Sequence, residues 1–225
     1  MKSTFVSIFV VSSLLGITSA EAASDEAVEP RIQGVELLKQ GKIDQAIGPL
    51  LKAAELNPKD PDVRLNLAYA YDRQGRIDEA IVQYEKAIEL SPRNSVAHNN
   101  LGVLYGKKGR YEEAVHEFEE AAGIDPTSTK ASENLATAKK NQAIVQTRER
   151  LLAEALSGAK AHPTSPIHAY KLARFYAFYG NRDQAIEWLE RALTLGFNDL
   201  GYVKVDTALE SLRDDPDYRW LVRGH

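Results

Sequence analysis

One constant spacing recurs through the first half of this 225-residue chain. Proline, glycine and alanine each recur every 34 residues, in three separate series, and we call this interval the period. The series are Pro58, Pro92 and Pro126; Gly41, Gly75 and Gly109; and Ala46, Ala80 and Ala114. So strict a period is typical of a repeat protein, in which every unit is one supersecondary element that stacks on the next.

Each unit is predicted to be a helical hairpin. Apolar residues follow helical spacing over residues 61–75, and again over residues 77–90 after a short break. Gly75 is expected to end the first helix because glycine adopts the left-handed conformation without strain. Pro92 follows the second helix, which its missing N–H and fixed φ prevent from continuing. Since no hairpin buries its own apolar face, the units must stack, and the predicted fold is all-α.

In the third unit the recurring positions hold small, aromatic and turn-forming residues: Asn99, Asn100, Leu101, Gly102, Tyr105, Gly109, Tyr111, Ala114, Phe118, Ala121 and Pro126. This pattern resembles the tetratricopeptide repeat. The resemblance implies an α-α superhelix, which is a solenoid of stacked antiparallel hairpins. Within residues 23–126 it predicts three units, at about 27–60, 61–94 and 95–128. The first unit lacks the large residue that opens the first helix, as suits a terminal unit exposed on one side.

The period falters between residues 127 and 165. Leu152 and Ala155 keep the register of the repeat, but Arg148 replaces the small crossing residue and no glycine marks a turn. Two alternatives remain for this segment: one long helix, or a degenerate repeat that bends near Asn141. A further repeat is predicted from Pro166 to residue 199.

Residues 200–225 are predicted to cap the array. They resemble the closing segments found at the end of some bacterial tetratricopeptide arrays, in which short helices cover the last apolar face. The side chains expected to provide this cover are Leu209, Leu212, Tyr218, Trp220 and Leu221.

The N-terminus has the three-part pattern of a secretory signal peptide. Lys2 precedes an apolar run from Phe5 to Ile17, and small residues follow it. The run is too short to span a bilayer core of ~30 Å. We expect residues 1–22 to be a cleaved signal peptide, with the cut after Ala20 or Ala22, and the mature chain to be periplasmic or secreted without stable membrane insertion.

Composition and motifs argue against an enzyme. The net charge of -4, with no block of five basic residues, gives no footprint for a nucleic-acid partner. The absence of cysteine excludes disulfides, thiolate metal sites and a cysteine nucleophile. The five histidines are scattered, and neither a GxSxG motif nor a complete P-loop is present. We therefore expect no catalytic residue, no metal site and no cofactor.

The predicted binding residues are asparagines one period apart, at Asn66, Asn100 and Asn134. A regular superhelix would bring them into a file on its inner, concave surface, where an amide offers a donor and an acceptor to an extended backbone. The file resembles the asparagine ladder of the O-GlcNAc transferase superhelix, which holds peptides in that way. The alternative is structural: each asparagine bonds to the neighbouring hairpin.

Neighbouring inward positions extend this candidate site. Leu65, Tyr69, Asn99 and Val103 are expected to be exposed on the concave face, where a partly apolar surface favours a ligand. Arg73 and Lys107, one period apart, are expected to attract an acidic segment.

Two functions of different class follow. The leading hypothesis is a non-enzymatic interaction module that binds a peptide or protein segment in the concave groove, as a scaffold, chaperone or assembly factor of the bacterial cell envelope. The alternative is a structural or regulatory partner that self-associates, or docks onto an envelope enzyme, through the helix at residues 128–160.

Overall fold

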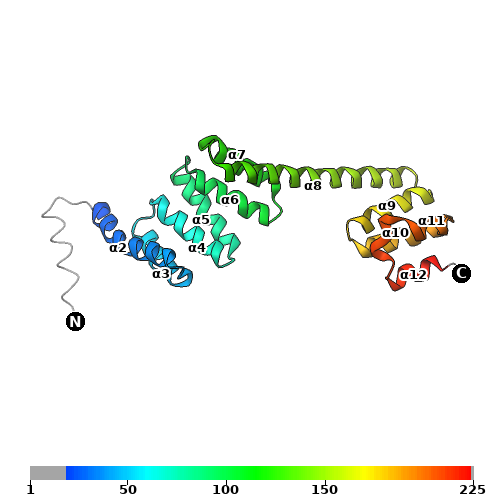
Figure 1. The fold of residues 1–225 in the computed structure, drawn as a ribbon, viewed down its shortest axis with the longest axis horizontal. Coiled ribbons are helices and arrows are strands. Elements are labelled where there is room, and N and C mark those ends of the chain that lie inside the picture. The colour runs from blue at the N-terminus through cyan, green and yellow to red at the C-terminus, as the bar shows by residue number, and fades with distance from the viewer. Residues whose placement is uncertain (1–18, 224–225) are drawn as a thin grey trace. The chain divides into compact units, whose positions relative to one another are not determined.

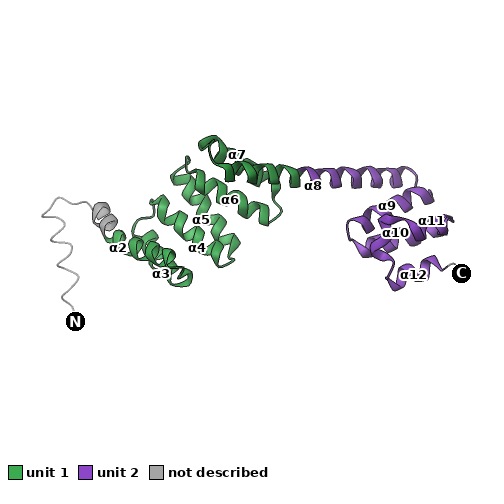
Figure 2. Ribbon diagram, viewed as in Figure 1, with its two compact units in different colours: residues 1–142 green, residues 143–225 purple. Residues whose placement is uncertain are grey.

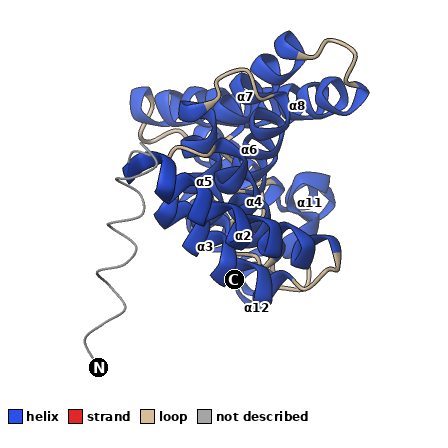
Figure 3. Ribbon diagram, turned by 90° about the vertical axis from the view of Figure 1, so that its left-hand side faces the viewer, coloured by secondary structure: helices blue, strands red, loops and turns tan. Residues whose placement is uncertain are grey.

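A computed structural model describes residues 19–223, with side chains from residue 26 onward. Residues 1–18 of the predicted signal peptide lie outside the described residues. The described part of the chain consists of helices and loops, without a strand (Figure 3). It divides into two compact units, residues 1–142 and residues 143–225 (Figure 2).

Consecutive helices pair into hairpins in unit 1 (Figure 1). The helices are α2 (Ser19–Lys39), α3 (Ile43–Leu56), α4 (Pro61–Arg73), α5 (Ile77–Leu90), α6 (Ser95–Lys107), α7 (Tyr111–Ile124) and the first part of α8 (Thr129–Ala161). The pairs are α2 with α3, α4 with α5, and α6 with α7. The all-α fold of helical hairpins predicted from the period is confirmed.

The hairpin turns depend on glycine in the left-handed region. Gly75 has a φ of 75°, and the N–H of Arg76 behind it donates to Tyr71 O at 2.9 Å, which satisfies a carbonyl at the end of α4. Gly109 does the same after α6, with a φ of 72°. At the start of α4, the side chain of Asp60 accepts hydrogen bonds from the first turn.

The alanine series lies where the two helices of each hairpin cross. Ala46, Ala80 and Ala114 are all 0% exposed. The helices also approach closely at Gly102, where a Cβ atom would lie 2.9 Å from the ring of Phe118. Small residues at these positions therefore allow the backbone approach on which the packing of each hairpin depends.

Helix α8 is one continuous helix of 33 residues rather than a bent hairpin. Its first part belongs to unit 1, where Ala131 and Ala138 are buried, and its second part belongs to unit 2. Arg148 is exposed on this helix, and its guanidinium lies 5.8 Å from the centre of the Tyr179 ring.

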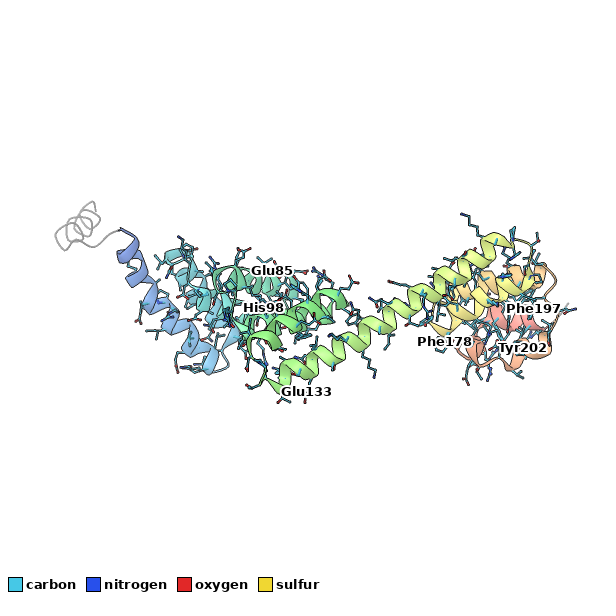
Figure 4. The ribbon with its side chains drawn as sticks, turned by 90° about the horizontal axis from the view of Figure 1, so that it is seen from above. Glu85, His98, Glu133, Phe178, Phe197 and Tyr202 are labelled. Atoms are coloured by element: carbon cyan, nitrogen blue, oxygen red, sulfur yellow. The ribbon has the colours of Figure 1, made fainter. Side chains whose placement is uncertain are left out.

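Unit 2 adds one more hairpin and three short helices. The hairpin is α9 (Pro166–Phe178) with α10 (Arg182–Thr194), followed by α11 (Leu200–Val205), the 3-10 helix η1 (Thr207–Leu212) and α12 (Pro216–Val222). Tyr170 of α9 stacks on Phe197 with ring centres 4.2 Å apart, and Tyr202 is tilted against Tyr170 with ring centres 6.1 Å apart. Figure 4 labels Phe197 and Tyr202 in unit 2. The Tyr170 hydroxyl donates to the buried Asp206 at 2.8 Å.

The last helices bury a set of side chains that differs in part from the predicted one. Leu209, Leu212 and Tyr218 are buried, and Tyr218 donates to Val203 O at 2.9 Å. Trp220, which we expected to cover the last apolar face, is 56% exposed, so that expectation is wrong. Tyr218 and Val222 share one face of α12 at a spacing of four residues, and a residue midway between them faces the other way.

Candidate functional site

Three hollows lie along the first helices of the hairpins in unit 1. One of about 330 Å³ lies between α2 and α4, one of about 410 Å³ is lined mainly by α2, α4 and α6, and one of about 200 Å³ is lined by α6, α7 and α8. We call the second the central groove. Its lining residues are Val35, Leu38, Lys39, Leu65, Asn66, Tyr69, Tyr84, Val96 and Asn100.

The repeat pattern explains how these side chains come together. Val35 and Tyr69 are one period apart and hold the same place on α2 and α4. Leu65 and Tyr69 are four residues apart on α4, so they share one face of that helix. Tyr69 and Val96 keep 39% and 55% of their surface exposed. The central groove therefore presents apolar side chains to the solvent.

The three asparagines of the predicted file do not line one common hollow, and Asn66 also lines the hollow between α2 and α4. Asn66 and Asn100 line the central groove, and Asn134 lines the hollow at α8. Each Nδ2 group already donates within the protein: Asn66 to Asp62 O at 2.8 Å, Asn100 to the Tyr84 hydroxyl at 3.3 Å, and Asn134 to Asn99 Oδ1 at 2.9 Å. The bonds of Asn100 and Asn134 reach the neighbouring hairpin, as the structural alternative requires.

Asn99 corrects one expectation about the site. We expected it to be exposed on the concave face, but it is buried, with 8% of its surface exposed. It accepts from Asn134 and donates to Asn100 Oδ1 at 3.3 Å, so a chain of hydrogen bonds runs from α8 through α6 to the Tyr84 hydroxyl of α5. Burial raises the pKa of Tyr84, which keeps its hydroxyl protonated in this chain.

Of the other predicted site residues, three line a hollow, whereas Arg73 and Lys107 line none of the three. Leu65 is half-buried and Tyr69 exposed, and both line the central groove. Val103 is half-buried in the hollow at α8. Lys107 is exposed and lies 2.7 Å from Asp72 Oδ1. Arg73 is exposed on α4.

Two further titratable groups near these hollows, His98 and Tyr105, are buried and bonded to groups on neighbouring helices. His98 is 6% exposed, with Nδ1 at 2.7 Å from Glu117 Oε2 and Nε2 at 3.0 Å from Pro92 O. The Tyr105 hydroxyl donates to Glu85 at 2.8 Å, and burial together with this bond raises the pKa of Tyr105 to about 12. The first contact joins the two helices of one hairpin, α6 and α7, and the second joins α6 to α5 of the preceding hairpin, so these groups serve packing.

No three His, Asp or Glu side chains of the described residues gather in a way that would hold a metal ion. None of the described helices combines the length and the apolar content that crossing a bilayer requires.

The sequence reasoning missed the contribution of α2 to the central groove. Val35, Leu38 and Lys39 line it, together with Val96 of α6. The signal that would have found two of them was the period itself, because Val35 aligns with Tyr69, and Lys39 aligns with Arg73.

Family models match four segments of the chain. A model described as "TPR repeat" matches residues 73–109. Three models described as "Tetratricopeptide repeat" match residues 37–83, 95–128 and 169–198. No curated protein matches the chain.

Solved structures share the fold. The first TPR of Spaghetti (RPAP3), bound to the HSP90 peptide SRMEEVD, is 26% identical, with a TM-score of 0.52 over 53% of this chain and 95% of that one. MamA residues 41 to the end from Desulfovibrio magneticus RS-1 is 19% identical, with a TM-score of 0.51 over 76% of this chain and 95% of that one. The Arabidopsis OM64 TPR domain is 20% identical, with a TM-score of 0.51 over 52% of this chain and 98% of that one. This chain therefore carries tetratricopeptide repeats, within residues 37–128 and 169–198, in an all-α fold of helical hairpins.

Proposed function

We propose that this chain is a non-enzymatic interaction module that holds a peptide or protein segment in the central groove. One observation carries the proposal: a hollow of about 410 Å³ whose apolar lining stays exposed, at Tyr69 and Val96 above all. Its volume falls within the range of about 300–1,000 Å³ that is usual for ligand pockets. Covering a concave apolar surface with a partner lowers the free energy, because the apolar side chains are removed from water.

The relatives support the class of ligand. Tetratricopeptide repeats are protein-interaction modules, and the similar Spaghetti (RPAP3) structure holds a seven-residue peptide. A ligand in the central groove would contact α2, α4 and α6, which belong to three successive hairpins. An extended segment suits such a surface because it crosses several repeats at once.

The proposal extends to the place of action. The signal pattern of residues 1–22 supports export, and with it a role as a scaffold, chaperone or assembly factor of the bacterial envelope. Residues 200–223, whose short helices pack on α9 and α10, would close the array. Fusing residues 1–30 to a reporter that is active only outside the cytoplasm tests whether this segment directs export, and we expect reporter activity. A soluble cytoplasmic product that retains Met1 contradicts it.

The groove is tested with exposed residues, because their loss does not disturb the core. A crosslinking pull-down from the native envelope names the partner, and its affinity is then measured directly. Tyr69→Ser with Val96→Ser should weaken binding at least tenfold, or about 1.4 kcal/mol. Val82→Ser is the matched control, since Val82 is 43% exposed on α5 and does not line the groove. If all variants bind the partner equally well, the central groove is not the binding site.

The asparagine ladder is tested separately. If Asn66 and Asn100 hold a ligand backbone, Asn66→Ala with Asn100→Ala weakens capture tenfold and leaves the melting temperature within a few degrees. If their role is the structural one, the same double variant lowers the melting temperature, because the Tyr84 hydroxyl loses its partner.

Self-association through residues 128–160 is the second candidate. Ile144 and Leu151, seven residues apart on α8, are 54% and 40% exposed, which favours it. A dimer that dissociates on Ile144→Ser with Leu151→Ser, without loss of helicity, would support this function. A monomer in sedimentation would exclude it.

A further inference from the structure

The central groove and the hollow at α8 are the same feature of two successive repeats. Three lining residues of the first recur one period later in the second, as the pairs Tyr69 and Val103, Tyr84 and Phe118, and Asn100 and Asn134. The hollow between α2 and α4 continues the pattern, because its Val35 and Asn66 lie one period before Tyr69 and Asn100. The hollows therefore follow one another at the spacing of the repeats, one for each pair of neighbouring first helices.

This spacing limits the conformation of a segment that enters two hollows. Successive hollows are separated by the width of one first helix, and helices packed side by side lie about 8–10 Å apart. In a β-strand, side chains of one face follow one another at about 6.6 Å and about 13 Å, at about 3.3 Å per residue. In the polyproline II conformation, which has three residues per turn and a rise of about 3.1 Å, they follow at about 9 Å. The polyproline II spacing matches that of the helices, whereas both strand spacings miss it.

The two hollows differ in what they accommodate. The central groove has a volume of about 410 Å³ and presents the exposed apolar surface of Tyr69 and Val96. The hollow at α8 has about 200 Å³, below the range of about 300–1,000 Å³ that is usual for a whole ligand, so it holds one small side chain. All its lining residues are uncharged, Gly102, Gly106 and Asn134 among them. A charged side chain would lose water there without gaining an opposite charge.

We propose that unit 1 binds a segment in the polyproline II conformation, which places a large apolar side chain in the central groove and a small uncharged side chain, three residues away, in the hollow at α8. Tyr69 and Tyr84 suit this ligand, because grooves that bind polyproline II segments are lined by aromatic side chains. The inference rests on the proposed function, because it names the class of segment that the same groove holds.

A displayed library of random 12-residue peptides, selected on the full-length chain, tests the spacing. The expected enrichment is a large apolar residue with Gly, Ala or Ser three positions away. Changing this small residue to Leu should lower the affinity at least tenfold, and so should inserting or removing one residue between the two positions. Changing both intervening residues to Pro should retain the affinity, because proline fixes φ at about −65°, near the polyproline II value of about −75°.

Gly106→Leu tests the hollow at α8 from the side of the protein. Gly106 lines this hollow, and a Cβ atom at this position lies in open space, so a leucine fills the hollow without displacing the core. The variant should lower the affinity of the selected peptides at least tenfold. Gly123→Leu is the matched control: Gly123 is likewise the next-to-last residue of its helix, has open space around it and lines none of the three hollows. Its affinity should be unchanged, and circular dichroism checks that both variants fold.

The outcomes separate this inference from the function beneath it. Peptides that lose binding on Tyr69→Ser with Val96→Ser, yet show no small residue three positions from the apolar one, overturn the inference and leave the groove intact. Loss of binding with the two prolines overturns the polyproline II conformation. Equal losses with Gly106→Leu and Gly123→Leu overturn the role of the hollow at α8. A library that yields no peptide dependent on Tyr69 and Val96 overturns both the inference and the proposed function.

Discussion

Residues 95–128 and residues 129–161 are successive segments of nearly equal length, yet only the first folds back on itself. In the first, α6 ends at a glycine in the left-handed region and α7 returns against it. In the second, Ala143 stands where the repeat has Gly109, and the helix continues. Helical periodicity alone does not decide between a hairpin and a long helix. The residue at the turn and the residue at the helix crossing decide whether the segment forms a hairpin.

Side chains at matching repeat positions are less buried in the continuous helix α8 than in the regular hairpin. Leu101 and Phe118 are 2% and 4% exposed in the regular hairpin. Their counterparts in α8, Leu135 and Leu152, are only half-buried, although they keep the register of the repeat. The crossing alanine Ala114 corresponds to the exposed Arg148. The apolar pattern of a repeat survives in α8 without the packing that it supports elsewhere.

The largest expected effect comes from giving the regular hairpin the crossing residue of α8. Ala114→Arg places a charge at a position that is 0% exposed, which should destabilise unit 1 by about 3–5 kcal/mol. Urea unfolding followed by circular dichroism measures the loss. His116→Arg puts the same residue at an exposed site of α7, where the change should stay within about 0.5 kcal/mol. Similar losses from both variants would mean that α6 and α7 do not cross at Ala114.

A smaller effect is expected at the turn. Gly109→Ala should cost about 1–2 kcal/mol, because Gly109 has a φ of 72°, where a Cβ atom meets the following carbonyl. Gly48→Ala should act in the opposite sense and stabilise by about 0.5–1 kcal/mol, since Gly48 is in the interior of α3 with open space around it. Thermal unfolding of the two variants reads out the sign. A higher melting temperature for Gly109→Ala would show that the turn does not depend on the left-handed conformation.

The smallest effect is expected from giving α8 the turn residue of the regular repeat. Ala143→Gly weakens the helix locally by about 0.5–1 kcal/mol. Amide hydrogen exchange between residues 140 and 147 should accelerate about two- to fivefold, with exchange in the hairpins α4–α5 and α6–α7 unchanged. If exchange at these amides does not change, helix propensity at this position does not hold α8 together.

Much of the fold is predictable because it repeats. The glycine and proline series mark the helix ends in unit 1, and the alanine series identifies the crossings, which are fully buried. The state of residues 129–161 is not predictable in the same way, since half the repeat positions argue for a hairpin and the missing glycine argues against it.

The site is less predictable, because a hollow depends on packing between helices. Leu65 and Tyr69 can be identified from one helix and Val35 from the period, but Val96 enters the groove only once α4 and α6 are packed side by side. The exposure predicted for Asn99 is wrong because a repeat position does not reveal that the next helix contributes an asparagine, Asn134, to cover it.

The chain of hydrogen bonds through Asn99 bears on how the repeats melt. In a linear array, stability is a sum of what each repeat contributes alone and what each interface contributes. The amides of Asn134, Asn99 and Asn100 add to two successive interfaces at once, from α8 to α6 and from α6 to α5. Opening either interface exchanges its hydrogen bonds for bonds to water, at a net cost of about 0.5–1.5 kcal/mol for each bond. We therefore expect the hairpins α4–α5 and α6–α7 and the first part of α8 to unfold more cooperatively than repeats that are joined by apolar contacts alone.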